Sequence, residues 1–131
     1  MEHRIINPWK WQDQFAFAQG YEISGGQKVL YCAGQASMDA EGKPAHAGDM
    51  RAQINRALDN LETVLADAGF GLSNVVRLNY YTTNVDQLFA NWDVFVSRLG
   101  QAGCRPSSTL LGVSRLAFPE LLIEIEATAV K

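Results

Sequence analysis

The chain has 131 residues, of which 47% are hydrophobic and 19% are charged, and its formal net charge is −3 at pH 7. These values are ordinary for a globular protein, so we expect a single domain over residues 1–131. The acidic balance offers no general attraction to phosphate backbones and argues against a nucleic-acid partner. No apolar run approaches the roughly 20 residues of a membrane helix, and the first residues lack a signal-peptide pattern. We therefore expect a cytoplasmic protein without a membrane contact.

The residue types that hold metals and cofactors are sparse. Cys32 and Cys104 lie far apart and are expected to be reduced thiols, and His3 and His46 have no metal-ligand spacing. Gly25-Gly26 indicates a turn rather than a phosphate-binding loop, because no helix follows it directly. We therefore expect no metal site and no cofactor.

The first third of the chain favours strands. Residues 1–14 show no clear period and are interpreted as a partly ordered lead-in. Residues 21–24 and 28–34 are predicted to form a hairpin, for which Gly25-Gly26 supplies the positive φ angles of a tight turn.

Two helices are predicted from apolar spacing. Asp49 can cap the first helix and Gly69 can end it. The second is expected to begin at Asp86 and to end at Gly100. Apolar residues at helical spacing form the buried stripe of the first: Ile54, Ala57, Leu58, Leu61, Val64, Leu65 and Ala68.

The remaining segments alternate with the period of a strand. Residues 75–82 form one such strand, and residues 105–130 are predicted as two strands around a loop at 115–120, where Pro119 interrupts pairing. In the last strand Ile123 and Ile125 point to one face, and Glu124 points to the other.

The predicted order is β-β-α-β-α-β-β, an α+β fold with a mixed sheet and two helices on one face. We expect the other face to expose Val, Leu and aromatic side chains. Such a face needs a partner, so the pattern predicts self-association.

Residues near the end of the chain carry a family resemblance. The run Ser108-Thr109 … Val113-Ser114-Arg115-Leu116 … Ile123-Glu124-Ile125-Glu126-Ala127 resembles the RidA/YjgF signature Pro-Ala-Arg-Ser … Val-Ala-Arg-Leu-Pro … Glu-Ile-Glu-Ala. One extra residue lies between Leu116 and Glu124, and the resemblance extends back to about Phe15. It implies a chorismate-mutase-like fold and a homotrimer with ligand sites between subunits.

The family's reactive-intermediate deaminases add water to an enamine or imine and release ammonia and a keto compound. The resemblance assigns the catalytic role, holding the attacking water, to Glu124. A carboxylate in a partly apolar cleft can orient water and move protons. The alternative from the residues alone is an ion pair of Glu124 with Arg77 or Arg115 across the sheet.

The substrate-binding positions depart from the family. Its carboxylate-gripping Arg is placed at Ser107, and its Tyr and Asn are placed at Phe17 and Phe89. Arg105 could replace the lost guanidinium, although a solvated Arg at the entry of the strand is the simpler interpretation. Ser107 and Thr109 offer hydroxyl groups in place of charge.

The sequence thus predicts a homotrimer that binds a small molecule in a non-standard pocket. Whether it hydrolyses an enamine or imine or only binds and regulates stays open. Older descriptions of the family as endoribonucleases or translation inhibitors provide a further alternative, which the acidic balance does not favour.

Overall fold

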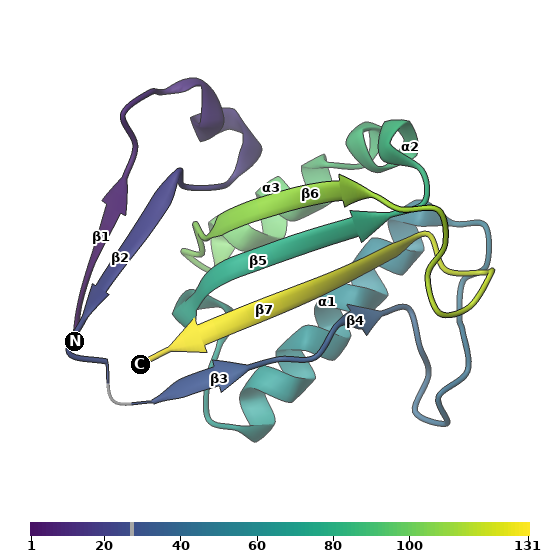
Figure 1. Cartoon of the computed structure of the whole chain (residues 1–131). Helices are drawn as coiled ribbons and strands as arrows, with labels where there is room; N and C mark the ends of the chain where they lie inside the picture. Colours follow the sequence, from purple (N-terminus) through teal and green to yellow (C-terminus); the bar gives the residue numbers. More distant parts are fainter. Residues whose placement is uncertain (27) are drawn as a thin grey trace.

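A computed structural model describes residues 1–26 and 28–131 (Figure 1). The strands are β1 (Glu2–Ile6), β2 (Gly20–Ser24), β3 (Val29–Tyr31), β4 (Gln35–Ala36), β5 (Val75–Thr82), β6 (Ser107–Gly112) and β7 (Ile123–Val130). The α-helices are α1 (Met50–Asp67), α2 (Val85–Ala90) and α3 (Asp93–Gln101). Two short 3₁₀ helices are η1 (Trp11–Phe15) and η2 (Leu72–Asn74).

The main sheet has the order β3-β7-β5-β6, and β4 also pairs with β7. β5 and β6 are parallel because α2 and α3 connect them, whereas β7 runs antiparallel to β5. α1 and α3 cover one face of this sheet (Figure 1). The predicted α+β fold with a mixed sheet is therefore confirmed.

The first predicted helix is α1, and local chemistry sets both of its ends. The side chain of Asp49 accepts a hydrogen bond from the backbone N–H of Ala52 at 3.0 Å. Gly69 follows the helix with a φ of 79°, and the N–H of Phe70 donates to the carbonyl of Leu65. Most of the predicted stripe is fully buried, whereas Val64 is partly buried and Ala68 is exposed.

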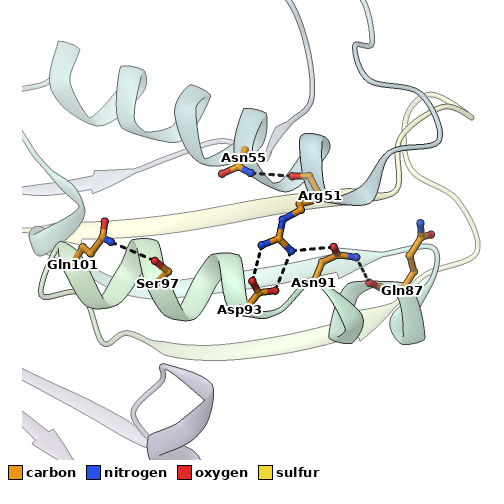
Figure 2. A network of polar contacts seen from close by, with 7 residues as sticks. All are labelled: Arg51, Asn55, Gln87, Asn91, Asp93, Ser97 and Gln101. Carbon is orange, nitrogen blue, oxygen red and sulfur yellow. Dashed lines mark hydrogen bonds and ion pairs between the residues drawn. The ribbon is translucent and has the colours of Figure 1, made fainter.

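The second predicted helix is divided into α2 and α3 (Figure 2). Asn84, rather than Asp86, caps α2 by accepting from the N–H of Gln87. The helix breaks at Asn91, and Arg51 of α1 donates to both Asn91 and Asp93 across the break. An interaction with another helix therefore holds the break, which apolar spacing alone does not reveal.

The two strand pairings predicted as neighbours in the chain are wrong. β2 pairs with β1, so the hairpin of 21–24 with 28–34 is absent, and β3 pairs with β7 instead. β1, which lies in the predicted lead-in, pairs with β2 along its whole length. β3 pairs instead with the end of β7. β6 and β7 are likewise separated by β5.

The face of the sheet opposite the helices, called the open face below, differs from expectation. Its centre is polar and carries Arg77, Asn79, Tyr81, Glu124 and Glu126. Large apolar side chains lie only toward its edges, where Tyr31 is 80% exposed and Val29 and Leu111 are each 50% exposed.

The N-terminal segment is ordered through β1, η1 and β2. The β1–β2 ribbon stands apart from the main sheet (Figure 1), and the chain returns to it where Ala18 bridges to Ser107 at the start of β6. Among the described helices, none has the length and apolar character needed to cross a membrane.

Candidate ligand-binding site

A cavity of about 260 Å³ lies where the N-terminal segment meets β6 and the helices. Its walls come from three parts of the chain: the segment around η1, strands β5 and β6, and the connection between α2 and α3. The lining residues are mostly aromatic: Trp11, Phe15, Phe17, Tyr80, Phe89, Trp92, Ser108 and Leu110. Two residues singled out from the sequence, Phe17 and Phe89, therefore meet in one cavity.

The aromatic rings pack in tilted and edge-on pairs. Tyr80 and Trp92 have ring centroids 4.8 Å apart, and Trp11 and Phe17 have centroids 5.7 Å apart. These separations suit favourable aromatic pairs. Burial raises the pKa of Tyr80 well above its ordinary value, so its hydroxyl stays neutral at physiological pH.

Ser107 does not line this cavity, and its neighbour Ser108 does. In the family signature the Arg stands two residues after the Pro, and two residues after Pro106 is Ser108. Ser107 also pairs with Arg77 and so shares the open face, on the other side of the sheet. The placement of the lost Arg at Ser107 was one residue off.

Ser107 and Thr109 belong instead to a polar cluster on the open face. Arg77 donates to Thr109 Oγ1 at 2.6 Å and to Ser107 Oγ at 3.5 Å. The hydroxyl of Ser107 donates to the carbonyl of Val76. Both hydroxyls are thus engaged within the sheet, away from the aromatic cavity.

Arg105 is neither a free cation nor a simple solvated side chain. Its guanidinium forms an ion pair with Asp13 of η1. Its Nε also donates to the carbonyl of Phe17 at 3.4 Å. Arg105 therefore fastens the N-terminal segment to the domain, and it does not line the cavity.

Glu124 lies half-buried on β7. Burial, with a smaller contribution from the charge of Glu126, raises the pKa of its carboxyl group. Within the described residues it forms no ion pair with Arg77 or Arg115, so the alternative interpretation finds no support. A Cβ at Gly34 would lie 2.8 Å from its Cδ, so the missing side chain of Gly34 gives the carboxylate its room.

Glu126 has a different environment from Glu124. It accepts hydrogen bonds from Tyr81 at 2.8 Å and from Asn79 at 3.2 Å. These bonds lower the pKa of Glu126. Two positions on the same face of β7 thus hold a well-paired carboxylate, Glu126, and one without a hydrogen-bond or ion-pair partner among the described residues, Glu124.

Glu124 and the aromatic cavity do not meet within one chain. Glu124 is level with Tyr81 and Leu111, three residues along β6 from Ser108 and two strands away. The strand geometry places the two Cα atoms roughly 14 Å apart, with their side chains on opposite faces. Only a second subunit could bring a Glu124 toward this cavity.

Sequence reasoning missed several cavity residues. Trp11 lies in the predicted lead-in, which has no clear period. Trp92 lies in the second predicted helix and Tyr80 in the predicted strand 75–82, where periodicity does not separate a cavity wall from a core residue. Alignment of Pro106 with the Pro of the signature places Ser108 at the position of the family's Arg and would have identified it.

The described ranges contain no group of three His, Cys, Asp or Glu side chains placed to hold a metal ion. Cys32 and Cys104 are both buried free thiols.

Comparisons with known proteins place this chain in a family. The sequence model of the family described as Endoribonuclease L-PSP matches residues 15–131. A RutC family protein of Pyrococcus horikoshii is 30% identical over 102 residues, which cover 78% of this chain and 79% of that protein.

Solved structures agree with the sequence matches. YyfB of Yersinia pestis, a protein of the conserved Rid family, is 34% identical with a TM-score of 0.89, and the match covers 100% of both chains. TdcF of E. coli, solved with bound serine, has the same fold with a TM-score of 0.70 at 22% identity, over 88% of this chain and 87% of that one. The chain therefore belongs to the RidA/YjgF family, as the signature in its last strands implied.

Proposed function

We propose that this protein forms a homotrimer that binds a small metabolite in the aromatic cavity and hydrolyses an enamine or imine there. The observation that carries the proposal is the meeting of Phe17, Phe89 and Ser108 in one cavity. These are the positions at which the family signature has its Tyr, Asn and Arg. The cavity at these positions supports a ligand site like that of the family, in which other side chains replace the family's polar groups.

The catalytic group in this proposal is Glu124 of a neighbouring subunit. A carboxyl with a raised pKa exchanges protons closer to neutral pH than an ordinary one. Water adds to the C=N carbon, and a C–O bond forms as the π bond breaks. The C–N bond then breaks, and both protons of the water leave with the nitrogen as ammonia while the carbon becomes a carbonyl.

Exposed apolar side chains on the open face support the proposed assembly. Because Glu124 and the cavity are separated within one chain, a combined site requires a subunit interface. The apolar edges of the open face at Val29, Tyr31 and Leu111 offer surface for such an interface.

Ammonia release tests the hydrolysis. Imines would be generated in situ by a flavin-dependent amine oxidase or by an amino-acid oxidase, and the rate would be measured above spontaneous hydrolysis. We expect Glu124→Gln to remove the protein-dependent rate. Glu120→Gln is the matched control, since Glu120 is an exposed loop carboxylate. Equal protein-dependent rates for the wild type and Glu124→Gln would remove Glu124 from the mechanism, and a wild-type rate no higher than the spontaneous one would leave a binding protein without this chemistry.

RNA cleavage is the function suggested by the wording of the family description. The net charge of −3 does not favour an RNA partner.

A further inference from the structure

The N-terminal segment forms a wall of the cavity that the family match does not include. The match begins at residue 15, whereas Trp11 lines the cavity and Asp13 binds Arg105. Gln12 between them is fully buried and donates to the carbonyl of Trp9 at 2.7 Å. The segment 11–17 is thus a wall of the site that is anchored by Gln12, while Trp11 is 55% exposed.

This segment, called the cover below, is fastened at several points. Asp13 pairs with Arg105, whose Nε also donates to the carbonyl of Phe17. At the other side of the cavity, Trp92 Nε1 donates to the carbonyl of Phe15 at 3.1 Å. The cover therefore bridges the start of β6 and the junction of α2 with α3.

The lining of the cavity carries no Lys, Arg, Asp or Glu. Its polar side-chain groups are the hydroxyls of Ser108 and Tyr80 and the indole N–H groups of Trp11 and Trp92. Trp92 Nε1 donates to the carbonyl of Phe15, whereas neither hydroxyl has a side-chain hydrogen bond among the described residues. An anionic ligand would lose its water without gaining a cation, which is costly in an apolar site. A neutral ring would instead pack against aromatic walls.

The size of the cavity limits the ligand further. At about 260 Å³ it lies just below the usual range of roughly 300–1,000 Å³ for ligand pockets. A single or fused ring with one hydrogen-bonding group matches this volume and the two free hydroxyls.

We propose that the cover, with Trp11 as its wall, makes this site selective for small neutral ring-bearing molecules and excludes carboxylates. The inference rests on the proposed function only in placing the ligand in this cavity. It assigns a specificity-determining role to Trp11, a residue outside the family match, and it explains why Arg105 is not free to receive an anion.

Benzamide and benzoate test the charge preference, because they share a ring and a planar substituent but differ in charge. Calorimetric titration of the full chain should give a dissociation constant for benzamide about tenfold or more below that for benzoate. Benzyltrimethylammonium tests whether the aromatic cavity also binds a cation. Binding of benzoate or of the cation as tight as that of benzamide would overturn the proposal.

Trp11→Ala tests the cover itself. Removal of this wall should weaken benzamide binding about tenfold, since aromatic side chains at binding sites often contribute this much. Trp9→Ala is the matched control, since Trp9 is as exposed as Trp11, at 58% against 55%, but lies outside the lining. Circular dichroism would establish that both variants are folded. Unchanged binding in folded Trp11→Ala would overturn the role of the cover.

The two proposals fail separately. A preference for benzamide without ammonia release would refute only the hydrolysis. Ammonia release that depends on Glu124, with no preference between benzamide and benzoate, would refute only the selectivity.

Discussion

At Ser108 the cavity has a hydroxyl where the family signature has a guanidinium. Ser108→Arg would place donors for a carboxylate among the aromatic rings. A charged hydrogen bond contributes about 1.5–3 kcal/mol, and about 1.36 kcal/mol corresponds to tenfold in rate. We therefore expect roughly tenfold to hundredfold faster ammonia release from 2-aminoacrylate and similar carboxylate imines.

Ser107→Arg is the natural control for this variant. It adds the same side chain one residue away, but on the open face beside Arg77. It should leave the turnover of carboxylate imines at the low wild-type level. A larger gain at 107 than at 108 would restore the original placement of the family Arg.

Glu124 and Glu126 should affect stability in opposite directions as the pH changes. The folded state raises the pKa of Glu124 above its ordinary value of 4.5, so the folded chain holds this proton to a higher pH than the unfolded chain. Its contribution to stability therefore falls as the pH rises through that interval. Glu124→Gln should gain stability relative to the wild type between pH 4 and pH 7.

Glu126 has a lowered pKa, so its contribution is present above its unfolded pKa and is lost as the pH falls. Glu126→Gln should lose stability relative to the wild type over the same rise in pH. Urea midpoints of the three proteins at both pH values measure this. Parallel trends for the two variants would contradict the opposite environments of these carboxylates.

At the scale of elements, Gln53 connects α1 to the loop that precedes it and to the loop that precedes β7. Its side chain is fully buried, donates to the carbonyls of His46 and Glu120, and accepts from the N–H of Leu122. Gln53→Ala leaves these buried backbone groups unpaired. Because each unpaired group costs about 1–3 kcal/mol, we expect a loss of several kcal/mol.

Chemical denaturation measures this loss. Gln101→Ala is the control, because Gln101 is an exposed residue of α3 that bonds only to Ser97. Its effect should stay within about 0.5 kcal/mol. A similar small effect at Gln53 would mean that the loops hold their positions without α1.

Local signals predicted the elements better than their partners. Asp49, Gly69 and the apolar stripe of α1 lie within one segment, so the sequence alone defined that helix. The pairing of β2 depended on β1, and the break at Asn91 depended on Arg51. Those contacts join distant segments, and periodicity carries no information about them.

The candidate site shows the same contrast between positions marked by a sequence pattern and positions that depend on contacts between distant segments. Phe17 and Phe89, which the family resemblance implied as substrate-binding positions, line a common cavity, whereas Trp11 had no pattern to mark it. The prediction placed the position of the family's Arg at Ser107 instead of Ser108. Because successive residues of a strand point to opposite faces, this shift of one residue exchanges the cavity for the open face.

At the scale of the whole molecule, we expect light scattering to report about three times the monomer mass of 14.4 kDa. Tyr31 is 80% exposed at the edge of the open face, so Tyr31→Glu should weaken the assembly and lower this mass at micromolar concentration.

Val96→Glu provides the comparison for assembly. Val96 is 38% exposed on α3, away from the open face, and its replacement should keep the mass of the wild type. A wild-type chain that stays monomeric would remove both the trimer and the shared site.

The position of β7 in the sheet also determines when the domain can fold during synthesis. β7 follows β3, β4 and β5 in the chain and leaves the ribosome after them, yet all three pair with it. Until residues 123–130 emerge, those strands lack their shared neighbour, and α1 has no complete sheet to cover. Because these pairings join residues far apart in sequence, the core of the nascent chain cannot close until β7 has been synthesised.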